Sequence, residues 1–549
     1  MDISLASPLR LPDELLLLIL GYVDAAEWKQ VRQTCRSLNI LAASLLFERV
    51  YFELCTRGCD SLYNISLDPI LSSFVKTLVL RRVHGYRKFP DFDTWAMSTH
   101  QPGDPDLDFN TARETTYYNN KKIRDQLMPY SEWTAMSREQ KEALYDSYNL
   151  DREQQQKEVR DITNKLRFRV LHSPRTTLIH PHRAYDSTAE DNAVEQFCEA
   201  LGTLPKLKAL EHEPGFLHDD TWGLQWRDLY FHPYSIIDST DYEEDEDVEA
   251  LQLSVVLQSL AWVREGDCRL QEMSIYVGGP AFATPERLQH LWDGDGHELT
   301  RTCRLVHRNS AAADVEAYSD FATPKQSKLF WAQLHLMKHA LTRLTYLDYR
   351  VSDEDELVGS LDTAAQLVFN FLTATSELQN LRLAFGRLAD GILQEVYAAD
   401  AKACSRASIK LLDHLTHHSP WRKLRDVELE IATDRATLVE FLFAHKSTLH
   451  SLTLTRTSLV RLGNPRNTWE LTLTEIGQGL RLKSLTLSKL CDIPQDWGPG
   501  VEKRVLFDVE DDIWKGKTNM YEAYHSAVVG RVIRGENVDS LNPPRSEAE

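Results

Sequence analysis

The stretch LPDELLLLILGYVDAAEWKQVRQTCRSLNILAASLLFERVYF, residues 11–52, decides how the beginning of the chain folds. Pro12 can open a helix, because its missing N–H would lack a partner in the first turn anyway. The helix expected over 14–23 is apolar on nearly every side, and two more short helices follow it. Three short helices cannot cover so much apolar surface among themselves. The stretch therefore predicts an apolar surface that binds another polypeptide. The alternative is an ordinary helical hairpin that packs on the rest of its own chain.

These residues resemble the F-box family, whose pattern runs Leu-Pro-x-Glu-Leu, Ile-Leu, Leu/Val-Arg-x-x-Cys-Arg, Asn-x-Leu and a closing bulky apolar residue. The matching positions are Leu11, Pro12, Glu14, Leu15, Ile19, Leu20, Val31, Arg32, Cys35, Arg36, Asn39, Leu41 and Phe47. Two positions differ: Leu38 stands where the family often has Trp, and Trp28 where it often has Leu. Both differences keep an apolar anchor, so they change packing more than binding.

The resemblance covers about a tenth of the chain. It implies docking to a Skp-type adaptor, which links F-box proteins to the cullin scaffold of a ubiquitin ligase. The adaptor contacts that it implies are Leu11, Pro12, Glu14, Leu15, Ile19, Leu20, Trp28, Val31, Cys35 and Leu38.

Composition narrows the range of partners. The chain has 549 residues and a formal net charge of −20, from 82 acidic and 62 basic side chains. This balance argues against binding to nucleic acid or to an anionic membrane, since both need positive charge on the protein. The leucine run follows two acidic residues and is too short to cross a bilayer, so no export signal is expected. Eight scattered cysteines fit reduced thiols in the cytoplasm or nucleus.

After the first fifty residues, a unit of an amphipathic helix followed by a short strand recurs. The strand halves are VKTLVL (75–80), LKALEH (207–212), LQEMSI (270–275), LTYLDY (344–349), LQNLRL (378–383), LRDVEL (424–429), LHSLTL (449–454) and LKSLTL (482–487). Helical stripes precede several of them, over 253–260, 330–341, 365–372 and 438–442. The alternation of period two means that each strand buries one face and exposes the other.

This unit resembles the leucine-rich repeat, with parallel strands inside a horseshoe and helices outside. The central apolar positions 347, 381, 427, 452 and 485 are 34, 46, 25 and 33 residues apart, whereas regular repeats are roughly 20–29 residues long. We therefore expect an α/β fold: a three-helix F-box followed by an irregular leucine-rich-repeat-like solenoid, as in fungal-type F-box proteins. An all-helical array of HEAT type is the competing fold, and the strands argue against it.

The expected domains are 1–52 for the F-box, 53–500 for the solenoid, and 501–549 for a C-terminal cap and tail. A polar insertion over 87–190 carries a charged helical segment at 130–169, which could either cap the flank of the solenoid or extend from it. The acidic run within 239–249 is expected to be a solvated loop, with docking of a basic partner as the alternative.

No catalytic, cofactor or metal motif is complete. The sequence Gly516-Lys517-Thr518 lacks the earlier glycine of a P-loop, and Gly477-x-Gly479 precedes a strand instead of following one. The histidines near 172–182 and 414–418 have the spacing of surface clusters. We therefore expect a protein that is not an enzyme, although a hydrolase hidden in the insertion is a weaker alternative.

The positions between the leucines of each strand should form the concave face. The target-binding candidates there are Tyr276, Tyr346, Arg350, Arg382, Asp426, Glu428 and Glu430. Tyrosine and arginine are enriched at interface hot spots, and three carboxylates on one strand favour a basic partner. The alternative is that Asp348, Arg382 and Glu428 pair with one another along the sheet and recognise nothing.

The expectation that follows is a substrate-recognition subunit of a Skp–cullin–F-box ubiquitin ligase. Its N-terminal helices would hold the adaptor, and the repeats would present an unidentified target protein. The alternative is a non-enzymatic repeat scaffold that binds the adaptor without driving ubiquitin transfer, and association with a cullin would distinguish the two.

Overall fold

The computed structural model describes a mixed α/β chain that divides into two compact units. Unit 1 comprises residues 1–207 and 213–248, and unit 2 comprises residues 208–212 and 249–549. The described residues are 11–23, 25–81, 91–99, 130–171, 189–213, 243–263, 270–275, 339–350, 372–385, 398–418, 421–460, 468–493, 504–507, 518–538 and 541. Among these residues, no helix has both the length and the apolar character that crossing a bilayer requires.

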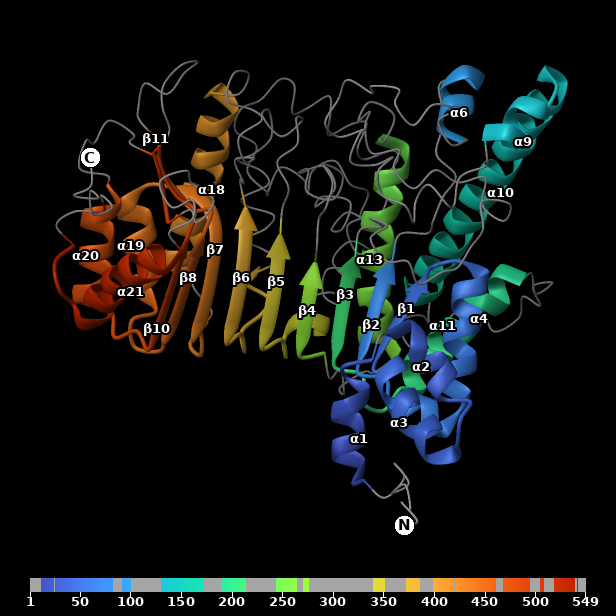
Figure 1. Ribbon diagram of the computed structural model, residues 1–549, viewed down its shortest axis with the longest axis horizontal. Helices are drawn as coiled ribbons and strands as arrows, with labels where there is room; N and C mark the ends of the chain where they lie inside the picture. The colour runs from blue at the N-terminus through green and yellow to red at the C-terminus, as the bar shows by residue number, and fades with distance from the viewer. Residues whose placement is uncertain are drawn as a thin grey trace, which may run out of the picture. The chain divides into compact units, whose positions relative to one another are not determined.

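Unit 1 begins with three helices and continues as a β-α-β segment followed by more helices (Figure 1). Its elements are α1 (Asp13–Leu20), α2 (Ala25–Val31), α3 (Arg36–Leu46), β1 (Arg49–Glu53), α4 (Thr56–Leu67), α5 (Pro69–Ser72), β2 (Thr77–Arg81), α6 (Phe92–Thr99), α9 (Tyr130–Ala135), α10 (Arg138–Leu171) and α11 (Ala189–Thr203). Strands β1 and β2 are parallel, with Arg49 opposite Thr77. All three predicted helices are present, whereas β1 was not predicted.

The polar insertion contains the helix expected there, as α9 and the 34-residue α10. The aromatic side chains Trp95, Trp133 and Tyr148 bring α6, α9 and α10 together in a small separate core. Further along α10, a Glu158 carboxylate oxygen accepts a hydrogen bond from the backbone N–H of Thr56 at 2.8 Å. The insertion is therefore packed into unit 1, and α10 provides a partner for the first turn of α4.

Unit 2 is built on a parallel sheet whose strands run side by side from β3 to β8 and β10 (Figure 1). Its strands are β3 (Ala209–Glu213), β4 (Glu272–Ile275), β5 (Tyr346–Arg350), β6 (Asn380–Phe385), β7 (Asp426–Thr433), β8 (Ser451–Thr455), β9 (Ser458–Val460), β10 (Ser484–Ser488), β11 (Leu490–Ile493) and β12 (Arg504–Leu506). All eight strands that the repeat pattern predicted exist, counting β2 of unit 1. The regular register keeps the leucines aligned, with Leu347, Leu381 and Val427 on neighbouring strands.

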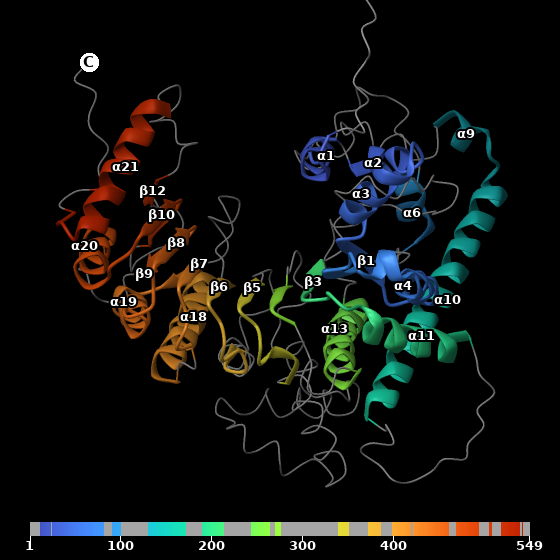
Figure 2. The same cartoon turned by 90° about the horizontal axis from the view of Figure 1, so that it is seen from below.

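Helices cover the leucine side of this sheet. They are α13 (Glu243–Val263), α18 (Ala398–His418), α19 (Arg435–Ala444) and α20 (Trp469–Gly479), whereas α21 (Thr518–Arg534) packs against α20 and β10 at the end of the sheet (Figure 2). Figure 2 shows α18 and α19 on the same side of β7 and β8, and α18 packs against both β7 and α19. The fold is therefore a parallel α/β solenoid-like sheet that does not close, not an all-helical array. The helices expected over 330–341 and 365–372 lie almost wholly outside the described residues.

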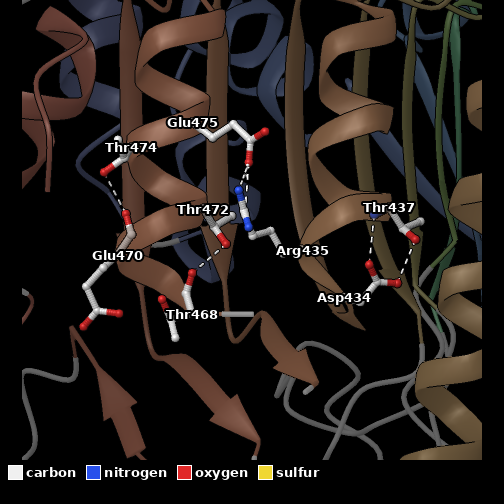
Figure 3. Close-up of polar contacts among 8 residues, drawn as sticks. All are labelled: Asp434, Arg435, Thr437, Thr468, Glu470, Thr472, Thr474 and Glu475. Atoms are coloured by element: carbon white, nitrogen blue, oxygen red, sulfur yellow. Dashed lines mark hydrogen bonds and ion pairs between the residues drawn. The ribbon is translucent and has the colours of Figure 1, made fainter. Parts of the chain in front are cut away.

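A polar contact links the neighbouring helices α19 and α20 of unit 2, beside contacts within each helix (Figure 3). Asp434 caps α19: its carboxylate accepts from the Thr437 N–H at 3.1 Å and from the Thr437 hydroxyl at 2.8 Å. Arg435 then reaches α20, where its guanidinium lies 2.6 Å from the Glu475 carboxylate. The ion pair between Arg435 and Glu475 thus joins α19 to α20 on the helical side of the sheet.

Two sequence expectations differ from the structure. The acidic run was expected to be a loop, but helix α13 begins at Glu243, so Glu243 to Asp247 occupy its first turns. The short strands β9, β11 and β12 were not predicted. The expected tail after Leu541 lies outside the described residues.

Candidate functional site

One side of the N-terminal helices exposes a concentrated apolar surface. Leu15 and Ile19 lie one turn apart on α1 and remain 46% and 49% exposed. The surface, which we call the apolar ledge, consists of Leu11, Leu15, Leu18, Ile19 and Tyr22, on α1 and next to its two ends; Ile40 of α3 is exposed as well. Contiguous exposed apolar patches of this kind mark interaction sites on folded proteins.

The opposite side of the same helices forms a small core. Leu16 and Leu20 of α1 are buried against Leu41 and Ala42 of α3. The indole N–H of Trp28 donates to the Leu20 carbonyl at 2.9 Å, which ties α2 to the end of α1. A helix that is apolar on all sides thus divides its side chains between an internal core and the ledge. The core fixes the ledge in place without covering it.

The polar residues of the N-terminal motif have structural contacts in the free chain. The Arg32 Nε donates to the Asn39 side-chain oxygen at 2.9 Å, and its guanidinium carbon lies 5.3 Å from the centre of the Phe47 ring. Cys35 precedes α3 as its N-cap residue. These contacts hold the turn between α2 and α3, so the spacing of the motif reflects the packing of the three helices.

The predicted adaptor contacts divide into three groups by burial. Leu11, Pro12, Glu14, Leu15 and Ile19 are exposed, and Trp28, Val31, Cys35 and Leu38 are half-buried. Leu20 differs from the expectation, because it is only 5% exposed and belongs to the internal core. We correct its role to packing.

Three exposed apolar residues of the N-terminal helices were absent from the predicted contacts. Leu18 is 58% exposed, and Tyr22 and Ile40 are exposed as well. The family pattern does not include them. The signal that could have identified them is the all-round apolar character of the first helix, since some of its side chains had to face outward.

On the sheet of unit 2, the positions between the leucines form a charged row. Arg382 of β6 lies between two carboxylates on the neighbouring strands, 2.8 Å from Glu428 of β7 and 3.6 Å from Asp348 of β5. Arg456 follows β8 and lies 3.6 Å from Glu430. The pairing that we considered as an alternative for Asp348, Arg382 and Glu428 is therefore present. Asp348 is fully buried, which removes it from any exposed surface.

The target-binding candidates are not all placed by the structure. Tyr276 and the side chain of Arg350 lie outside the described residues. Tyr346, Glu428 and Glu430 are half-buried, and Asp426 is exposed. The row continues into Thr453 and Thr486, and the Ser484 hydroxyl donates to Ser451 at 2.7 Å. The exposed part of the face is therefore acidic at β7 and hydroxyl-rich at β8 and β10.

Burial holds two cysteines and one histidine in their neutral forms. Burial raises the pKa of the Cys55 thiol to about 11 and raises that of Cys59 further, so both are protonated at neutral pH. Burial also lowers the pKa of His445, which keeps its ring neutral. Among the described residues, no group of three His, Cys, Asp or Glu side chains could hold a metal ion.

An open cavity of about 410 Å³ lies where strands β4 to β6 begin. It is lined by Gln271, Arg343, Thr345 and Glu377. Glu377 forms an ion pair with Lys423, and the Thr345 hydroxyl donates to the Gln271 carbonyl at 3.2 Å. These contacts belong to the links between repeats.

A comparison with protein families supports the geometry of the N-terminal helices. Residues 8–53 match the F-box-like family. No curated protein matches the chain. The match contains the whole described ledge and its core and ends at the last residue of β1.

Proposed function

We propose that this chain is a substrate receptor of a Skp–cullin–F-box ubiquitin ligase. The F-box-like domain at residues 8–53 suggests a role in binding the adaptor of such a ligase. The single observation that carries the proposal is the exposed apolar ledge on α1. A domain of this family with its leucines turned outward is suited to dock another protein.

The ledge is large enough to matter energetically. Burial of a half-exposed Leu or Ile gains about 1 kcal/mol of transfer free energy, at about 25 cal/mol per Å². Four such side chains, together with Tyr22, offer several kcal/mol before the costs of association are subtracted. The surplus suffices for a specific complex if the adaptor is complementary in shape.

The experiment is co-purification of the full chain with a Skp-type adaptor. The double variant Leu15→Asp, Ile19→Asp places two negative charges in the centre of the ledge. It should abolish co-purification, because a buried unpaired charge costs several kcal/mol. Both side chains are about half exposed, so the fold should tolerate the change. The matched control is Leu150→Asp on α10, since Leu150 is 65% exposed in the same unit. Undiminished binding by the double variant would contradict the proposal.

In this proposal, the sheet of unit 2 binds the target. Tyr276, Tyr346, Arg350, Arg382, Asp426, Glu428 and Glu430 stay the candidates. Since Arg382 already lies between two carboxylates, a phosphate on the target would meet a negative surface there. A basic, unphosphorylated segment is the better complement to Asp426 and Glu428.

The chain itself would supply no reacting group. Its part would be to hold the target near a ubiquitin-carrying enzyme, which raises the effective concentration of the two reactants. A scaffold that binds the adaptor without ubiquitin transfer is the second candidate. Co-purification of a cullin with the wild-type complex favours the receptor, and its absence in the presence of bound adaptor favours the scaffold.

A further inference from the structure

One edge of the sheet in unit 2 carries a group of exposed cationic side chains. Three connections lead from a helix into a strand at this edge: from α18 to β7, from α19 to β8 and from α20 to β10. Because β7, β8 and β10 are parallel neighbours, the three connections meet at the edge where the strands begin (Figure 1). Together they expose five cationic side chains, which we call the basic edge: Arg422, Arg425, Lys446, Arg481 and Lys483.

Backbone hydrogen bonds hold the three connections side by side. The Arg425 carbonyl accepts from the His450 N–H at 2.7 Å, and the His450 carbonyl accepts from the Lys483 N–H at 2.7 Å. Since neighbouring strands lie about 5 Å apart, the backbones of Arg425 and Lys483 are about 10 Å apart. The other three members of the basic edge lie within four residues of these positions along the chain. The five charges therefore belong to one small surface.

This surface has a charge opposite to that of the whole chain, which is formally −20. None of its five members forms an ion pair with a carboxylate among the residues that the structure describes. Two carboxylates lie near it: Asp426 is exposed next to Arg425, and Glu377 is paired with Lys423. The basic edge therefore keeps an excess of positive charge that its own surroundings do not neutralise.

Stabilisation of the helix ends does not account for these cations. Basic side chains favour the C-terminus of a helix through the helix dipole, but this effect is confined to the last turn. The last turns of α19 and α20 contain no basic residue, and that of α18 contains His417 and His418 instead. All five members of the basic edge come after these turns, so the helices do not explain them.

The basic edge adjoins the open cavity of about 410 Å³ at the start of β4 to β6. The Arg425 N–H donates to the Gln379 carbonyl at 2.7 Å, and the Gln379 N–H donates to the Thr345 carbonyl at 2.9 Å. Thr345 lines the cavity. A segment that binds along this edge thus meets a row of positive charges and then a hollow.

We infer that the basic edge is a docking site for a short acidic segment, rich in Asp and Glu, of a partner protein. The planar guanidinium groups of its three arginines can each bind a carboxylate through two parallel hydrogen bonds. The attraction reaches only about 8 Å at physiological ionic strength. A long nucleic acid would extend past this surface onto a chain of negative net charge, which would repel it. The inference goes beyond the proposed function, because it involves neither the adaptor surface nor the face of the sheet.

The test measures binding of a fluorescent acidic peptide to the full chain by fluorescence anisotropy. A peptide of about ten alternating Asp and Glu residues spans the basic edge, since an extended chain covers about 3.4 Å per residue. The double variant Arg425→Glu, Arg481→Glu should bind this peptide at least about tenfold more weakly, because two repulsive contacts replace two attractive ones. Both side chains are exposed and outside any ion pair of the described residues, so the fold should tolerate the change.

The matched control is the double variant Arg160→Glu, Arg406→Glu. These arginines are exposed on α10 and in the first half of α18, away from the basic edge. The control changes the net charge by the same amount, so it should bind the peptide nearly as tightly as the wild type. Circular dichroism should show equal helix content in all three proteins.

Three results would overturn the inference. The wild type would fail to bind the acidic peptide, or the control would lose as much affinity as the Arg425→Glu, Arg481→Glu variant, which would reduce the effect to net charge. In the third, a single-stranded oligonucleotide of the same charge would bind the basic edge more tightly than the peptide. The adaptor is absent from this assay, so none of these results bears on the proposed function.

Discussion

The neighbouring residues Leu15 and Leu16 should separate adaptor binding from stability. Leu16 is 6% exposed and belongs to a core with only four buried members, whereas Leu15 is 46% exposed on the ledge. Leu→Ala in a protein core costs about 2–5 kcal/mol. Because this core is small and lies close to the surface, we expect Leu16→Ala to cost about 2–3 kcal/mol, at the lower end of that range.

Hydrogen exchange on the full chain measures this difference directly. A loss of 2–3 kcal/mol in the opening free energy accelerates exchange of the α1–α3 amides by about 30- to 150-fold. Leu15→Ala should leave these amides nearly as protected as in the wild type, and should weaken the adaptor complex instead. Equal exchange in the two variants would refute the division of α1 into a core side and a docking side. The amides of β7 in unit 2 serve as the internal control.

Two further predictions concern unit 2. Asp426→Lys reverses an exposed charge on the acidic part of the sheet. The variant should therefore bind a basic target protein more weakly, while its binding to the adaptor stays unchanged. Equal or stronger binding of the basic target would contradict the proposed target class. Burial lowers the pKa of His445 below its ordinary value of 6.5, so the unfolded chain binds more protons as the pH falls. The contribution of neutral His445 to the free energy of unfolding is therefore complete above about pH 6.5 and is lost as the pH falls below this value. The melting temperature of the wild type should drop between pH 7.5 and 5.5 more than that of His445→Gln, and parallel curves would show that another group is responsible.

Much of the parallel sheet could be predicted from the sequence. The alternation of period two in segments such as LHSLTL (449–454) predicted both the strands and their buried faces, because one face of each strand packs on helices and the other does not. Strands β9 and β11 follow residues with positive φ, Arg456 at 48° and Lys489 at 49°. A bend at a non-glycine residue has no sequence signature, so these two strands could not be predicted.

The sequence predicted which residues make up the candidate site better than it predicted which way their side chains face. The motif identified the three helices, but it could not show which leucines face inward, since α1 is apolar on all sides. Leu20 was therefore assigned to the wrong side, and Leu18 was missed. On the sheet, the sequence placed Arg382 and Glu428 in one row, yet only the structure shows that the arginine lies between two carboxylates.

The hydrogen bond from the Thr56 N–H to Glu158 means that the insertion helps to hold helix α4 in place. A segment of about a hundred residues between two strands looks dispensable, as if it could be cut out and replaced by a short linker. Helix α4, which ends at Leu67, would then lose the carboxylate that satisfies its first turn, along with the packing of α10 in unit 1. Shortened versions of the chain would thus disturb the region next to the N-terminal helices, although the residues removed lie far from them in sequence.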